Sequence, residues 1–121
     1  MNRISTGRKG ELIARKHLEA AGFEILATNW RGENAEIDII TQKDNELVFV
    51  EVRAKSTREF GSPAESITRR KRQKLIGAAE CYLAQHQVET DWRIDFIGIE
   101  FFDGTHRLEH IPYAVTLDDL V

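Results

Sequence analysis

Residues 47–55 read Leu-Val-Phe-Val-Glu-Val-Arg-Ala-Lys, and this stretch decides the fold of the chain. A near-continuous apolar run of this kind is typical of a central strand that is covered on both faces of a sheet. Side chains alternate between the faces of a strand, so Glu51, Arg53 and Lys55 should emerge on one side of its end. Charges just beyond a buried strand are costly unless they are paired, hydrated or bound to an ion. The stretch therefore predicts a functional site as well as a strand.

A second strand pattern lies upstream in residues 35–40, which read Ala-Glu-Ile-Asp-Ile-Ile. Its alternation predicts Asp38 on one face and Ile37 and Ile39 on the other. If the two strands pair, Asp38 and Glu51 lie close together, and a hard divalent cation such as magnesium would relieve their repulsion. Any half-exposed strand shows the same alternation of acidic and aliphatic residues, so an ordinary strand without a metal site stays open as the alternative.

The composition indicates a globular chain. With 121 residues, 41% of them hydrophobic and 31% charged, residues 1–121 are expected to form a single domain. No run approaches the length of a membrane span, so no membrane association is expected. One cysteine, Cys81, leaves no internal disulfide and favours a reducing compartment, the cytoplasm. The net charge of −3 argues against indiscriminate binding to nucleic acid.

The order of predicted elements is helix, three strands, helix, strand. The three strands should form an antiparallel meander, and the second helix should carry the chain across to a strand parallel to the third. This predicts a three-layer α/β domain with a mixed sheet in α-β-β-β-α-β order, followed by a final strand. The predicted ranges are 6–21 and 68–85 for the helices, and 23–30, 35–41, 46–54, 94–101 and 108–115 for the strands.

Both helices show a buried stripe. In the first helix, capped by Ser5 or Thr6, the stripe is predicted to contain Leu12, Ile13, Leu18 and Ala21. In the second helix, capped by Thr68, it is predicted to contain Leu75, Ile76, Ala79, Tyr82 and Leu83.

Several segments occur together in a characteristic order. Asp38 is followed thirteen residues later by Glu51-Val52-Arg53, and the flanking motifs are Gly7-Arg8-Lys9-Gly10-Glu11, Ala35-Glu36-Ile37-Asp38-Ile39-Ile40, Phe60-Gly61-Ser62-Pro63 and Arg93-Ile94-Asp95-Phe96. This set resembles the PD-(D/E)xK nuclease superfamily, which has the restriction-endonuclease-like fold. More closely, it resembles the YraN-like family of small uncharacterised bacterial proteins. Archaeal Holliday-junction resolvases share the same layout.

The resemblance implies a metal site. It assigns the metal carboxylates to Asp38 and Glu51, and a third protein ligand to the carbonyl of Val52. Glu11 on the first helix would reach the metal directly or through water. The implied cofactor is Mg²⁺ or Mn²⁺, and the implied activity is hydrolysis of phosphodiester bonds.

The last position of the nuclease motif departs from the usual lysine, because it is Arg53. A lysine can lose a proton and help to activate water, whereas a guanidinium stays charged. Arg53 would still clamp a phosphate and stabilise developing negative charge. Lys55, one strand step away on the same face, is the candidate to replace the missing lysine. A milder departure is Ala35, where the family usually has glycine.

Basic residues crowd the start of the second helix, at Arg69, Arg70, Lys71, Arg72 and Lys74. Cations at this end oppose the helix macrodipole, each at a cost of about 0.3–1 kcal/mol. One interpretation is that these residues form a solvent-exposed face of the helix. The other is that they bind phosphates or offset the negative charge of the carboxylate cluster. The residues predicted to bind nucleic acid are Arg8, Lys9, Arg69, Lys71 and Lys74, with Lys71 and Lys74 expected to face the site.

Other residues are predicted to be structural. Trp30 and Trp92 are expected to pack, and Asp95, within an apolar strand, to make a buried hydrogen bond. The histidines have no zinc-like spacing and are expected at the surface: His17, His86, His106 and His110.

Three hypotheses of function remain open. The first is a magnesium- or manganese-dependent nuclease that acts on nucleic acid, with DNA favoured and branched or single-stranded forms as candidates. The second is a nucleic-acid-binding module whose catalytic site is dormant, and the third is an interaction scaffold. A homodimer would suit junction cleavage, because it would place two sites on two strands.

Overall fold

The computed structural model describes residues 5–56 and 67–120. The elements in this part are α1 (Thr6–Ala20), β1 (Glu24–Arg31), β2 (Glu36–Lys43), β3 (Glu46–Ser56), α2 (Arg69–Gln85), β4 (Asp91–Phe102), β5 (Thr105–Val115) and the 3-10 helix η2 (Leu117–Leu120). The predicted three-layer α/β fold is confirmed. The final strand begins earlier than expected, at Thr105, and its pairing with β4 is interrupted by a register shift between Ile94 and Phe96. The motif predicted at residues 60–63 lies outside the described residues.

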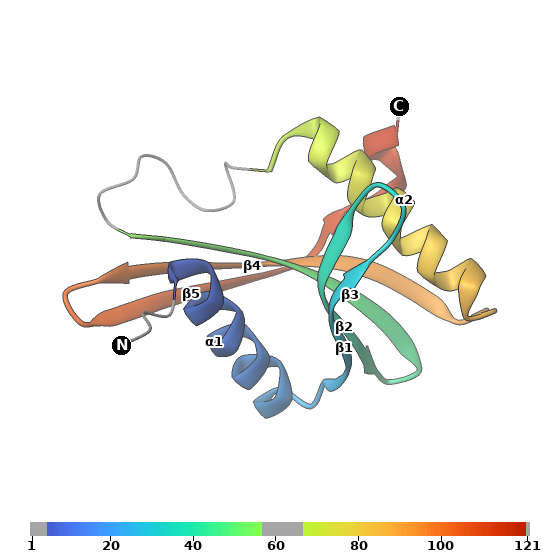
Figure 1. Cartoon of the computed structure of the whole chain (residues 1–121). Helices are drawn as coiled ribbons and strands as arrows, with labels where there is room; N and C mark the ends of the chain where they lie inside the picture. The colour runs from blue at the N-terminus through green and yellow to red at the C-terminus, as the bar shows by residue number, and fades with distance from the viewer. Residues whose placement is uncertain (1–4, 57–66, 121) are drawn as a thin grey trace.

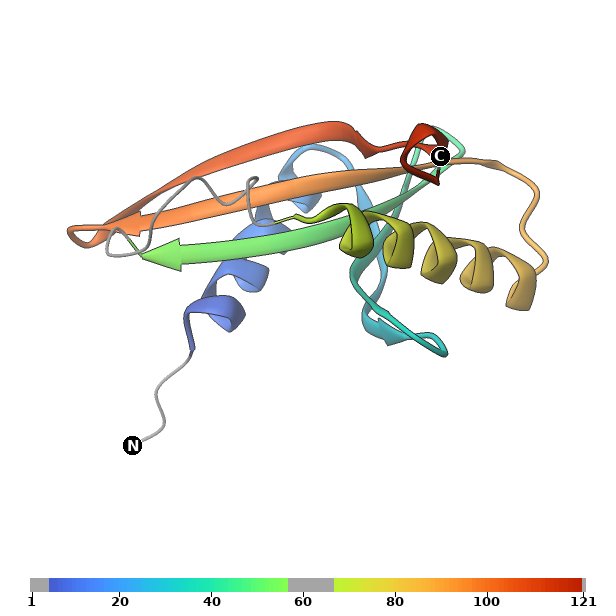
Figure 2. The same cartoon turned by 90° about the horizontal axis from the view of Figure 1, so that it is seen from above.

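The five strands form one mixed sheet in the order β1-β2-β3-β4-β5. Neighbouring strands are antiparallel except β3 and β4, which run parallel on either side of the α2 crossover. A two-residue turn joins β2 to β3, where Asp44 and Asn45 both have positive φ. Such a turn suits the right-handed twist of the strands. Seen from above, β3, β4 and β5 run alongside one another as long ribbons (Figure 2).

The two helices cover opposite faces of the sheet (Figure 1). Successive side chains of β3 lie on alternate faces of the sheet. Leu47 and Phe49 join the core beneath α2, whereas Val48 and Val50 join the core beneath α1. All four are at most 5% exposed. The apolar run of β3 is therefore continuous because both faces of the strand are buried.

The buried stripe of α1 differs from the predicted one. It consists of Gly10, Ala14 and Leu18, whereas Leu12 is 39% exposed and Ala21 is exposed. Small residues at intervals of four bring the helix close to β3. A Cβ atom added at Gly10 would lie only 2.5 Å from the Cβ of Ala54. Close approach of the two backbones, which a hydrophobicity pattern does not reveal, selects this face of the helix.

The second helix behaves as predicted. The side chain of Thr68 caps it by accepting a hydrogen bond from the backbone N–H of Lys71, at 3.1 Å. Trp30 and Trp92 pack against the core beneath α2, which confirms their structural role. The buried face contains Leu75, Ile76, Ala78, Ala79 and Tyr82, and Leu83 is partly buried beside it.

The second strand bends where its pairing with β3 stops. The β2–β3 ladder runs only as far as Ile39 opposite Val50, and beyond it the β1–β2 turn lies beside α2 (Figure 1). Ile37 consequently joins the core beneath α2 while Ile39 joins the core beneath α1. The prediction that these two isoleucines share a face was wrong, because it assumed a straight strand.

A buried polar network ties α1 to β4 and β5. Asp95 is fully buried, and its carboxylate contacts Arg93 at 3.0 Å, His110 at 2.8 Å and the backbone N–H of Tyr113 at 3.1 Å. His110 in turn lies 3.0 Å from a ring nitrogen of His17. The predicted hydrogen-bonded role of Asp95 is confirmed. The prediction that His17 and His110 are surface residues was wrong, because the fold partly buries them against each other although they are far apart in the sequence.

Candidate functional site

Asp38 lies where β2 and β3 separate, one residue beyond the last rung of their ladder. Its carboxylate Oδ2 accepts a hydrogen bond from the backbone N–H of Val52, at 2.8 Å. The side chain thus replaces the backbone acceptor that β2 would supply if the ladder continued. This geometry holds the partly buried carboxylate of Asp38 between the two strands. Its hydrogen-bond donor, Val52, directly follows Glu51 on β3.

The carboxyl group of Glu51 is buried beside Asp38, on the face of the sheet that carries α2. It is 3% exposed. Burial, then the negative charge of Asp38 and a hydrogen bond with its side chain, raise the pKa of Glu51 to about 8. The positive charges of Lys71 and Arg53 lower this pKa, but burial and Asp38 outweigh them. The pair of carboxyl groups predicted from the two strand patterns therefore does come together.

Two cations from different elements flank Glu51. The Arg53 guanidinium, on β3, lies 3.3 Å from Glu51 Oε2, and the Lys71 ammonium, at the start of α2, lies 3.5 Å from the same oxygen. The Arg53 side chain is 41% exposed, yet its Nε is buried without a hydrogen-bond partner in the described part of the chain. Arg53 therefore keeps an unused donor beside the carboxyl pair.

Glu11 lies outside this pair. Its carboxylate accepts a hydrogen bond from the side chain of Asn29 on β1, at 2.8 Å. Within residues 5–56 and 67–120, no group of three or more Asp, Glu, His or Cys side chains is close enough to hold a metal ion. The structure thus brings together two of the three predicted metal carboxylates, and the backbone N–H of Val52 on β3 donates to one of them, Asp38.

Lys55 is directed to a different partner. Its ammonium lies 3.6 Å from the carboxylate of Glu100, which is directly opposite it on β4. The side chain of Lys55 is 9% exposed. Its predicted role as a substitute for the motif lysine stays a prediction, and this ion pair holds it toward β4.

The remaining basic residues lie on both helices, and only Lys71 contacts the pair in the part of the chain that the structure describes. Lys71 contacts Glu51 as expected, but Lys74 lines a pocket between α2 and the β1–β2 turn. Lys9 lines a groove beside the β4–β5 turn. Four of the predicted nucleic-acid contacts are exposed: Arg8, Lys9, Arg69 and Lys74.

The pocket beside α2 contains residues that were not predicted as site residues. Asn34, Gln73 and Gly77 all line it. A glycine in the interior of an otherwise regular helix was the sequence signal that could have indicated it. The two amides carry no such signal, because only the fold brings residue 34 next to α2.

The chain has clear relatives. The model of the uncharacterised protein family UPF0102 matches residues 10–99. The chain belongs to this family. It is 44% identical over 117 residues to a UPF0102 protein of Roseiflexus castenholzii, covering 93% of this chain and 94% of the relative. It is 42% identical over 115 residues to a UPF0102 protein of Dehalococcoides mccartyi, covering 94% and 95%. The YraN-like resemblance seen in the motifs is thereby confirmed.

A more distant similarity exists to a solved structure, that of Pyrococcus furiosus SfsA in complex with Ca²⁺. It is 14% identical with a TM-score of 0.40, and the alignment covers 91% of this UPF0102 chain and 63% of that chain. A similarity at this level carries no argument about activity or ions. None of the helices in the described part of the UPF0102 protein is long and apolar enough to cross a membrane.

Proposed function

We propose that this UPF0102 protein is a divalent-metal-dependent nuclease that hydrolyses phosphodiester bonds, with Asp38 and Glu51 at its centre. The observation that carries the proposal is the buried Glu51 carboxyl, held against Asp38; burial, and then the negative charge of Asp38, raise its pKa to about 8. Such an arrangement costs stability, and perturbed carboxyl groups of this kind cluster at functional sites.

The donor set fits Mg²⁺ or Mn²⁺. Both ions prefer oxygen ligands, and Mg²⁺ commonly binds one or two protein carboxylates while keeping several waters. Asp38 and Glu51 would hold the ion, joined by the carbonyl of Val52, and Glu11 would act through water from its place beside Asn29. When bound, such an ion lowers the pKa of water and stabilises charge on a phosphoryl group.

The cations of the site have roles that follow from their positions. Arg53, whose side chain is 41% exposed beside the carboxyl pair, binds a non-bridging phosphate oxygen and stabilises the charge that develops there. Lys71 approaches the same point from α2, so the two cations bracket the phosphate. Neither needs to lose a proton for this role, which accommodates arginine at the last motif position.

Cleavage assays on labelled single-stranded, duplex and four-way-junction DNA test the proposal, with Mg²⁺ or Mn²⁺ and with EDTA. Asp38→Asn and Glu51→Gln preserve the shape of each side chain and should lower the rate about 100-fold or more. Glu36→Gln is the matched control, because Glu36 lies on the same strand, is exposed and pairs with Arg31 at 3.8 Å. Equal cleavage by all four proteins would reveal a contaminating nuclease and refute the proposal.

One observation favours a second candidate, a nucleic-acid-binding module without catalysis. Lys71 and Arg53 already lie next to Glu51, and no third carboxylate joins the pair within the described residues. In that case DNA binding would be sensitive to salt, independent of metal and unaccompanied by cleavage. Binding of wild type in EDTA, together with the absence of any cleavage that depends on Glu51, would favour this candidate.

A further inference from the structure

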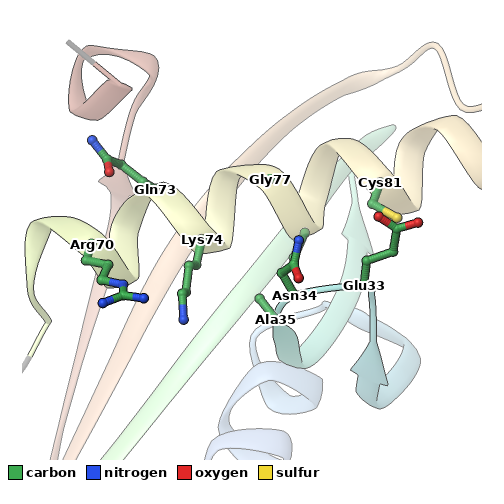
Figure 3. A pocket seen from close by; sticks show the side chains of 9 residues that line it. Glu33, Asn34, Ala35, Arg70, Gln73, Lys74, Gly77 and Cys81 are labelled. Atoms are coloured by element: carbon green, nitrogen blue, oxygen red, sulfur yellow. The ribbon is translucent and has the colours of Figure 1, made fainter.

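A pocket of about 380 Å³ lies between α2 and the β1–β2 turn (Figure 3). This volume falls within the range of about 300–1,000 Å³ that is usual for small-molecule sites. Its wall from the turn consists of Glu33, Asn34 and Ala35, and its wall from α2 consists of Arg70, Gln73, Lys74, Gly77, Ala78 and Cys81.

Gly77 in this wall has no packing explanation. A Cβ atom added at residue 77 would meet no described atom within 4 Å, whereas one added at Gly10 would clash with Ala54. Glycine destabilises the interior of a helix relative to alanine. The structure thus explains Gly10 by close packing but offers no such reason for Gly77. A reason arises if a flat ligand lies against the helix backbone at this point.

The charges of the pocket are divided between its two ends. Arg70 and Lys74 lie at one end, Glu33 and Cys81 lie at the other, and Asn34 lies between them (Figure 3). Cations suit a phosphate group, and a carboxylate suits the N–H groups of a base. The side-chain amide of Asn34 adds a donor and an acceptor that match a base edge. The amide of Gln73 instead donates a hydrogen bond to the backbone carbonyl of Asp119, at 3.2 Å.

The cationic end lies next to the proposed active site. Lys74 follows Lys71 by one helical turn, and Lys71 contacts Glu51 at 3.5 Å. Ala35 precedes Asp38 by three residues, which is about 10 Å along an extended strand. A nucleotide in the pocket would therefore adjoin a phosphodiester at Asp38 and Glu51.

We propose that this pocket holds one nucleotide of an unpaired nucleic-acid strand, with its phosphate at Arg70 and Lys74 and its base over Gly77. The inference rests on the proposed function, because it defines the substrate class of the same site. A base that is paired within a duplex cannot enter such a pocket until it leaves the stack. The protein consequently prefers single-stranded or locally unpaired nucleic acid over intact duplex.

Two leucine substitutions on α2 test the pocket. Gly77→Leu fills it from the helix side, and Ala84→Leu, at an exposed position of the same helix outside the pocket lining, serves as the control. Leucine is a good helix former and neither substitution changes the charge, so both variants should fold. Binding of a fluorescent oligonucleotide, single-stranded or annealed to its complement, is measured by anisotropy in EDTA, where cleavage does not interfere.

Wild type and Ala84→Leu should bind the single strand more tightly than the duplex, and Gly77→Leu should lose about tenfold of single-strand affinity or more. Duplex affinity should be the same in all three proteins. A Gly77→Leu variant that binds the single strand as wild type does would overturn the pocket assignment while leaving the nuclease proposal intact. A wild type that neither binds nor cleaves any nucleic acid would instead overturn the proposed function itself.

Discussion

The buried carboxyl group of Glu51 should make the stability of the metal-free protein depend on pH. In the folded protein its pKa is raised from 4.5 to about 8. In the unfolded chain the group returns to its ordinary value and loses its proton near pH 4.5. Between these two values the folded state holds a proton that the unfolded state lacks, so the free energy of unfolding falls as the pH rises.

The magnitude follows from the same two values. Each pH unit within this window costs about 1.4 kcal/mol, so the contribution of Glu51 should decrease by about 3 kcal/mol between pH 5 and pH 8. Glutamine resembles the protonated acid in shape and cannot ionise. Glu51→Gln should therefore be nearly neutral at pH 5 and should stabilise the metal-free protein by about 3 kcal/mol at pH 8.

Urea unfolding in EDTA, repeated across this pH range, measures the difference between wild type and Glu51→Gln. Glu80→Gln is the matched control, because Glu80 is exposed on α2 and its substitution should leave the pH profile unchanged. Parallel pH profiles for wild type and Glu51→Gln would show that Glu51 is ionised in the folded protein. That result would refute the electrostatic description of the site.

Three further predictions concern the scaffold. Gly10→Ala should destabilise the protein by about 1–3 kcal/mol in urea unfolding, because its Cβ would lie 2.5 Å from that of Ala54, and Ala54→Gly in the same chain should restore stability. Burial, and then the charge of His110, lower the pKa of His17, so wild type should lose stability relative to His17→Gln as the pH falls from 7 to 5; a constant difference would contradict this. Gly77→Ala should raise the free energy of unfolding by about 0.5–1 kcal/mol, and a lower melting temperature would show a packing role for Gly77.

Local sequence patterns were sufficient for the order of elements and for the carboxyl pair. The apolar run of β3 identified a strand buried on both faces, and the spacing of Asp38 and Glu51 on adjacent strands placed both carboxyl groups near each other. These predictions succeeded because strand periodicity and pairing between consecutive elements are determined by neighbours along the chain.

The tertiary structure decided which charges meet. From the sequence, Lys71 and Lys74 were equally good candidates to face the site. The packing of α2 on the sheet brings Lys71 to Glu51 and Lys74 to the neighbouring pocket. Likewise, His17 and His110 are 93 residues apart and form one buried network through Asp95. Contacts of this kind depend on the angle and depth at which whole elements pack, and no local pattern encodes those quantities.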